Sequence, residues 1–132
     1  MGKIFSANAA SVIFLIAMFG LIFFHLAVMA GLVPTEIIWG GRAAETGLSL
    51  MTLEAIALSI ISVFILFVLA KRRNLRTGNN SGLINFGMWL IFALFALNTL
   101  GNLAALSSTE TLLFTPVTII LALCGLRLAL AR

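Results

Sequence analysis

The sequence predicts an all-α fold, a four-transmembrane-helix bundle, and three observations support it. Of 132 residues, 62% are hydrophobic and 9% are charged, whereas soluble domains carry about 25% charged residues. Four apolar runs reach the ~20 residues that a helix needs to cross the ~30 Å hydrocarbon core of a bilayer. The runs lack the period-two alternation of barrel strands, and only helices or closed barrels can span a bilayer.

The first expected span covers residues 9–33. Lys3 before it and the small residues 28–30 resemble parts of a signal peptide. The apolar stretch is about twice the usual 7 to 15 residues of such a peptide, so we favour a retained helix.

The connection after the first span is long for a helical hairpin and mixes apolar with polar residues. The amphipathic ring of Trp39 suits the headgroup layer of a membrane. Gly40 and Gly41 allow a sharp reversal just before Arg42. We expect this loop to lie at the membrane surface. The alternative is a lid that covers the mouth of the bundle and presents Arg42 inward.

The second expected span covers residues 48–70 and leads into a basic cluster at positions 71–76. With four spans, this cluster lies on the same side as Lys3 and Arg132, and the opposite side holds Glu36, Glu45, Glu110 and Arg42. Lys and Arg near helix ends are retained in the cytoplasm, so we expect both termini to be cytoplasmic. A basic cluster also attracts nucleic acid, but its place directly after a span favours a topology anchor. We therefore expect the lipid bilayer as a partner, and no nucleic acid.

The third and fourth expected spans cover residues 83–106 and 112–131. Ser107 and Glu110 between them match a capping box, in which each side chain bonds a backbone amide of the other residue. The small residues Gly101 and Ala105 predict that another helix, the first span, approaches the third span closely. Cys124 is the only cysteine, and we expect a buried, inert thiol.

Ionisable groups within the spans are few, and each costs at least ~2.5 kcal/mol when charged at a central position. Arg127 is close enough to a helix end to reach the headgroups. His25 and Glu54 lie roughly 12 and 9 Å below the outer ends of their spans, because a helix rises ~1.5 Å per residue. Antiparallel threading therefore brings these two residues to one level.

Asn98 and Asn102 are one turn apart in the third span and lie at a similar depth. We expect His25, Glu54, Asn98 and Asn102 to face the bundle axis as one hydrogen-bonded cluster, open outward and closed by Arg42. The structural alternative is a polar clasp in which each bond between helices contributes ~0.6 kcal/mol. A clasp is favoured for the two asparagines, whereas for Glu54 the two alternatives weigh about equally.

Several kinds of chemistry are disfavoured by the residues present. No lysine lies within a span, which excludes retinal bound as a Schiff base. One histidine and one cysteine cannot assemble a zinc site, and His25 alone is weak evidence for haem. No serine has the context of a catalytic nucleophile. We expect no cofactor, no metal site and no catalytic residues, and we treat an enzyme as the less favoured class.

Four elements of the chain are Trp39-Gly-Gly-Arg42, Glu54, Asn98-Thr-Leu-Gly-Asn102, and Thr115-Pro116 leading into Cys124-Gly-Leu-Arg127. In these elements the chain resembles a group of small uncharacterised bacterial four-helix integral membrane proteins. The resemblance implies the same architecture and a location in the cell inner membrane. It implies no activity.

Three hypotheses on function follow from the sequence. The first is a non-enzymatic bundle that binds a small molecule, an ion or a lipid headgroup in an outward-facing polar pocket. The second is a non-catalytic accessory subunit of a larger membrane complex, whose polar residues serve only as clasps. The third is a small proton-coupled carrier that works as a homodimer.

Overall fold

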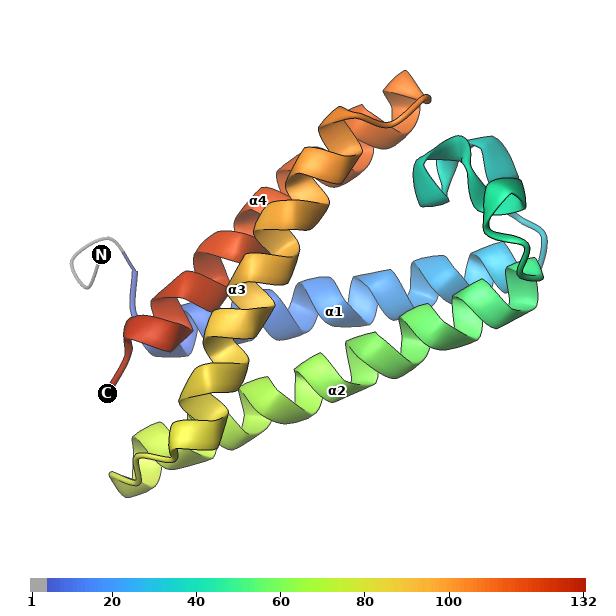
Figure 1. The fold of residues 1–132 in the computed structure, drawn as a ribbon. Coiled ribbons are helices and arrows are strands. Elements are labelled where there is room, and N and C mark those ends of the chain that lie inside the picture. Colours follow the sequence, from blue (N-terminus) through green and yellow to red (C-terminus); the bar gives the residue numbers. More distant parts are fainter. Residues whose placement is uncertain (1–4) are drawn as a thin grey trace.

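The structure is a computed structural model that describes residues 5–132; Lys3 lies outside the described residues. The described part contains four long helices, α1 (Ala7–Met29), α2 (Leu50–Thr77), α3 (Gly82–Leu103) and α4 (Ser108–Leu130) (Figure 1). Each is 22 to 28 residues long and apolar enough to cross a membrane. The prediction of an all-helical chain with four candidate membrane spans is confirmed, and these spans are those of a multi-pass membrane protein.

Local sequence signals explain where the helices begin and end. The side chains of Ser6, Ser49 and Ser107 each accept a hydrogen bond from an amide in the first turn of the following helix. The first helix ends at Met29, earlier than the expected span, and the chain turns there through Gly31 at a φ of +74°. Such a positive φ strains any residue with a side chain, but not glycine.

The second helix continues beyond the expected span to Thr77 and ends at Gly78 in the left-handed conformation. The basic residues 71–76 therefore lie on the last turns of α2 rather than in a connection. Lys71 is 2% exposed and donates hydrogen bonds to the Ala131 carbonyl at 2.7 Å and to Asn85. Its ammonium group therefore joins α2 to the end of α4 and to α3, and the role of the basic cluster as a topology anchor stays a prediction.

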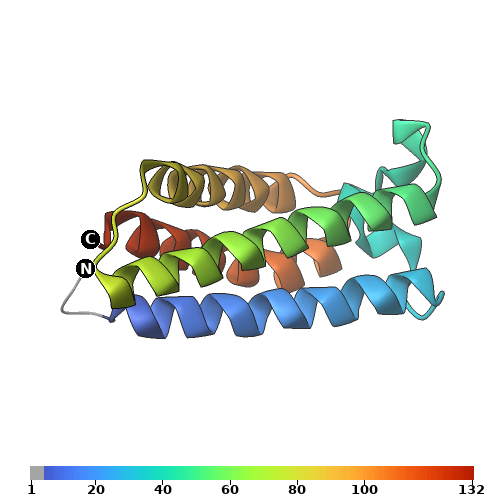
Figure 2. The same cartoon turned by 90° about the horizontal axis from the view of Figure 1, so that it is seen from below.

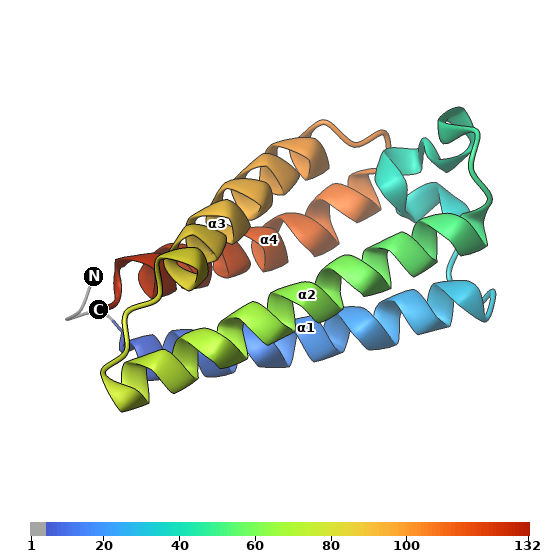
Figure 3. The same cartoon turned by 60° about the horizontal axis from the view of Figure 1, so that its bottom comes forward.

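The helices form two antiparallel hairpins that diverge along their length. Helix α3 packs mainly on α4, and α1 packs on α2 and α4. Figures 1 and 3 show the hairpins close together at the end where α1 begins and α4 ends, and separating toward the other end. We call the close end, which carries Arg72, Arg76, Arg127 and Arg132, the arginine end.

The other end is the loop end, where residues 30–49 connect α1 to α2. This connection, the short-helix loop, contains the 3₁₀ helices η1 (Thr35–Ile37), η2 (Trp39–Gly41) and η3 (Ala43–Thr46). In Figure 2 it lies at the opposite end of the helices from the α2–α3 connection. It contacts the α3–α4 connection, because the Leu106 amide donates a hydrogen bond to the Gly40 carbonyl at 3.3 Å.

The apolar core lies in the middle and at the arginine end. Its largest fully buried side chains are Phe14, Met18, Met88, Leu121 and Leu128. Other large apolar side chains point outward, and Phe23 and Leu66 are 73% and 65% exposed. An exposed apolar surface of this extent is expected where lipid, rather than water, surrounds the helices.

The close glycine contacts differ from the expected one. A Cβ atom on Gly87 of α3 would overlap the ring of Phe67 in α2, so glycine lets the two hairpins meet there. A Cβ atom on Gly125 of α4 would lie 3.3 Å from the backbone of Phe92 in α3, so glycine permits this approach. A Cβ atom on Gly101 would meet nothing within 4 Å. The expected close contact of the first and third helices at Gly101 is therefore wrong, because the hairpins have already diverged at that level.

Candidate functional site

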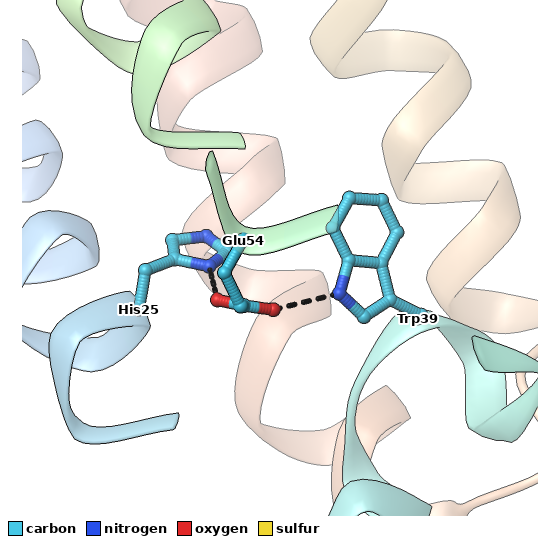
Figure 4. Close-up of polar contacts among 3 residues, drawn as sticks. All are labelled: His25, Trp39 and Glu54. Carbon is cyan, nitrogen blue, oxygen red and sulfur yellow. Dashed lines mark hydrogen bonds and ion pairs between the residues drawn. The ribbon is translucent and has the colours of Figure 1, made fainter. Parts of the chain in front are cut away.

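A buried carboxylate joins two helices and the short-helix loop. Glu54 of α2 is completely buried, and its Oε2 lies 2.5 Å from Nδ1 of His25 in α1. Its Oε1 accepts a hydrogen bond from the indole N–H of Trp39 at 2.8 Å. Figure 4 shows the carboxylate between the two rings. The indole N–H of Trp39 can only donate, which fixes the direction of that bond, whereas the direction of the bond with His25 depends on the tautomer of its ring.

The short-helix loop is tied to the helices at a second point. The Gly40 amide donates to Oε1 of Glu110, at the start of α4, at 2.8 Å. Trp39, the first of the two tethered residues, has a φ of +55°. This conformation costs a non-glycine residue about 1–2 kcal/mol. The hydrogen bonds of Trp39 and Gly40 to two buried carboxylates hold this strained turn in place. These bonds hold the loop against the loop end of the bundle, and its place at the membrane surface stays a prediction.

Glu110 departs from the expected capping box. The Ser107 hydroxyl accepts from the Glu110 amide at 3.4 Å, which is half of the box. The Glu110 carboxylate, however, accepts from Gly40 instead of closing off an amide of its own helix. Glu110 is 6% exposed, and its Oε2 has no hydrogen-bond partner among the described residues.

A second polar network joins α3 to α4. The Asn102 amide donates to the Thr118 hydroxyl at 3.2 Å, and Thr99 donates to the same oxygen at 3.0 Å. The Thr111 hydroxyl donates to the Asn102 carbonyl at 2.6 Å. Asn98, one turn from Asn102, is exposed, and it takes part in none of these bonds. These contacts are what the clasp alternative predicts for Asn102.

Within residues 5–132, the four expected cluster residues do not form one hydrogen-bonded cluster. His25 and Glu54 meet as expected, whereas Asn102 belongs to the separate α3–α4 network. The physical reason is the divergence of the hairpins, which leaves α3 facing α4 rather than α1 at this level.

A cavity of about 570 Å³ lies between the diverging hairpins, beneath the short-helix loop. This volume is within the range of about 300–1,000 Å³ that is usual for small-molecule sites. Most of the lining is apolar and includes four phenylalanines, Phe24, Phe64, Phe95 and Phe114. The side chains able to form hydrogen bonds are His25, Trp39, Arg42, Asn98, Asn102, Glu110 and Thr118.

The cavity gathers four of the five residues that the sequence singled out. His25, Arg42, Asn98 and Asn102 line it, and Glu54 lies behind His25 and Trp39. Sequence reasoning missed Trp39 and Glu110 as site residues. The Trp-Gly-Gly turn indicated a sharp reversal, but nothing in the sequence gives the direction in which the indole points.

No protein-family model, curated protein or solved structure matches the chain. Function is therefore inferred from the cavity and its polar groups alone.

Proposed function

We propose that this protein binds an amphipathic small molecule in the cavity beneath the short-helix loop. The apolar body of the ligand lies between the two hairpins, and its hydrogen-bonding head lies under the loop. The observation that carries the proposal is a large cavity, mostly apolar, that also presents polar groups from the loop and from the nearby helix ends.

The apolar part of the lining suits a hydrocarbon or aromatic body. Ile61, Phe64 and Phe95 come from α2 and α3 and lie toward the middle of the bundle. Burial of each CH₂ group against such side chains contributes ~0.8 kcal/mol when it leaves water. A ligand already dissolved in lipid gains less, so the polar contacts of its head supply much of the selectivity.

The polar part of the lining suits a head that both donates and accepts hydrogen bonds. Arg42 and Asn98 can donate to the head. Asn98 also has an acceptor oxygen, and Glu110 lines the cavity with one oxygen unpaired among the described residues. A hydroxyl group satisfies both requirements with a single atom, because it is donor and acceptor at once.

Glu54 has the role of a positioning residue in this proposal. It is fully buried, and both of its oxygens are already bonded to protein. It fixes the ring of His25 at the cavity wall and holds the Trp39 turn across the cavity mouth. Loss of Glu54 therefore acts on the ligand through these two side chains.

The experiment uses bromine quenching of Trp39 fluorescence by 2-bromododecan-1-ol, with Trp89→Phe as the background so that Trp39 is the sole tryptophan. The chain has only these two tryptophans. We expect saturable quenching by the alcohol and about five-fold weaker quenching by 2-bromododecane, which lacks the hydroxyl and its hydrogen bonds.

A matched pair of substitutions on α2 separates the cavity from the detergent-facing surface. Ala57 is buried and lines the cavity, whereas Ala55 is exposed and does not. Ala57→Phe fills the cavity and should remove the saturable component, and Ala55→Phe should leave it unchanged. Equal quenching in the two variants, or no preference for the alcohol, would contradict the proposal.

We also propose that the chain lies in the bacterial inner membrane with both termini in the cytoplasm. The separation of arginines from carboxylates at the two ends of the bundle supports this orientation. Alkaline phosphatase fused after Gly47 should be active, and the same fusion after Asn79 should be inactive. The reverse pattern would contradict it. The resemblance to the small bacterial membrane proteins, the accessory subunit and the homodimeric carrier stay predictions from the sequence.

A further inference from the structure

A second cavity, of about 420 Å³, lies at the arginine end. It is formed by the first turns of α1, the last turns of α2 and the end of α4. Four arginines line it, Arg72, Arg76, Arg127 and Arg132. These residues come from two helices and the C-terminal segment and are brought together only by the fold.

No carboxylate side chain balances these four charges. The four acidic residues of the chain are Glu36, Glu45, Glu54 and Glu110, all at the loop end. Among residues 5–132 the salt bridge formed is His25 with Glu54, and residues 1–4 contain no acidic side chain. A concave site lined by charges of one sign focuses its field and attracts the opposite charge.

Two of the guanidinium groups are oriented by hydrogen bonds that leave other N–H groups available. Arg127 donates through Nε to the Phe5 carbonyl at 3.1 Å, and Arg72 donates through Nη2 to Asn8 at 3.1 Å. A guanidinium carries five N–H donors, so each keeps most of them. The planar fork of donors matches the oxygens of a phosphate group in pairs.

We propose that this arginine cavity binds a phosphate group. The site lies at the level where helices α1, α2 and α4 begin or end, and the apolar side chains of Leu75 and Leu130 line it as well. A phospholipid headgroup with its chains along the helices fits this setting, and a free phosphate anion shares the same chemistry. The site is independent of the cavity beneath the short-helix loop.

The test is isothermal titration calorimetry of the delipidated full chain in uncharged detergent. Three titrants are compared: dihexanoyl phosphatidylglycerol, dihexanoyl phosphatidylcholine and sodium phosphate. We expect the phosphatidylglycerol to bind about ten-fold more tightly than the phosphatidylcholine, whose own cation competes for the phosphate. If sodium phosphate binds and competes with the lipid, the site takes a free anion. If the lipid binds and sodium phosphate does not compete, the site takes a lipid headgroup. Either result supports the proposal.

Arg76→Gln and Arg73→Gln form the matched pair, because both remove one charge from the same helix end and only Arg76 lines the cavity. We expect Arg76→Gln to weaken binding about ten-fold through lost charged hydrogen bonds. Arg73→Gln should stay within about two-fold, as for an exposed charge. Arg127→Gln should weaken binding as Arg76→Gln does.

Two results would overturn the phosphate site. One is equal affinity for the two lipids together with no binding of sodium phosphate. The other is an equal loss in Arg73→Gln and Arg76→Gln, which would reduce the effect to diffuse positive charge. Both arginines are exposed, so neither substitution disturbs the core, and an unchanged melting temperature verifies this for each variant.

Discussion

The two ends of the bundle differ in both charge and packing. The loop end holds all four carboxylates, and the described lysines and arginines other than Arg42 lie toward the arginine end. The apolar core fills the middle and the arginine end, whereas a mostly apolar cavity of about 570 Å³ lies at the loop end. At the loop end, hydrogen bonds to the buried carboxylates of Glu54 and Glu110 replace much of the side-chain packing that holds the arginine end together.

This difference indicates how a chain of 132 residues can keep a cavity open. Close packing in one half fixes the helices relative to one another, since packed side chains have few alternative arrangements. The other half can then diverge, with a few tethers holding a loop across the opening. The following substitutions test this division, from the largest expected effect to the smallest.

Gly125→Leu should have the largest effect on stability, because it forces the packed half apart. A Cβ atom at this position already lies 3.3 Å from the Phe92 backbone, and overpacking of this kind costs about 1–3 kcal/mol. The matched change at the open end, Gly101→Leu, meets no atom within 4 Å of its Cβ and should cost at most about 0.5 kcal/mol.

The measurement for both glycine variants is the free energy of unfolding in mixed micelles of mild detergent and dodecyl sulfate. Gly101 lines the cavity, so Gly101→Leu should weaken quenching of Trp39 by the brominated alcohol while leaving stability intact. Equal destabilisation by the two substitutions would mean that the two halves are packed alike.

Glu54→Ala should have the next largest effect, because it removes the buried carboxylate that bonds both His25 and Trp39. The expected loss of unfolding free energy is about 2 kcal/mol. Glu54→Gln keeps one acceptor oxygen and should lose about 1 kcal/mol. The exposed Glu36→Ala is the control, with a change within about 0.5 kcal/mol. Equal stability of the wild type and Glu54→Ala would show that Glu54 does not tether the loop end.

Much of this fold could be predicted from the sequence, since span length and composition depend only on the thickness of a bilayer. The depth of a side chain in its span was predictable in the same way, from the rise per residue of a helix. This reasoning correctly placed His25 and Glu54 at one level. The divergence of the hairpins was not predictable. The hairpins meet where Gly87 of α3 leaves room for the ring of Phe67 in α2, whereas Gly101 of the same helix has no such neighbour.

The candidate site was only partly predictable, because rotation about a helix axis leaves no periodic signal when most sides are apolar. Asn98 and Asn102 share a helix face, yet Asn102 is buried against Thr118 and Asn98 is exposed. The capping-box pattern assigned Glu110 a role within its own helix, so the sequence offered no reason to expect a distant contact. Its bond to Gly40 spans 70 positions of the chain, and no local pattern indicates such a contact.

Trp39→Phe should have a smaller effect than Glu54→Ala, because it removes one hydrogen bond and keeps an aromatic ring. We expect a loss of about 1 kcal/mol of unfolding free energy. The amides of residues 35–46 should also exchange hydrogen for deuterium faster, since the loop loses one of its two side-chain tethers. Trp89→Phe is the matched control, because Trp89 is exposed to a similar extent, 44% against 37% for Trp39, and takes no part in the bonds of the loop. Unchanged exchange in Trp39→Phe would argue against a tethered lid.

Thr118→Val should have the smallest effect and tests whether the loop end holds one polar network or two. The substitution keeps the shape of the side chain and removes the acceptor used by Asn102 and Thr99. Hydrogen bonds between membrane helices average ~0.6 kcal/mol, and we expect a loss of that size.

Combining Thr118→Val with Glu54→Ala then measures the coupling between the two networks. Residues that share no partner have additive effects within about 0.5 kcal/mol, so we expect no coupling beyond that value. A larger coupling would show that the carboxylate of α2 and the hydroxyl of α4, which bonds Asn102, act together. Glu54 and Asn102 would then be linked, as in the predicted single cluster. The loop end would then close as one unit around its ligand, instead of through a tethered loop on one side and a fixed helix pair on the other.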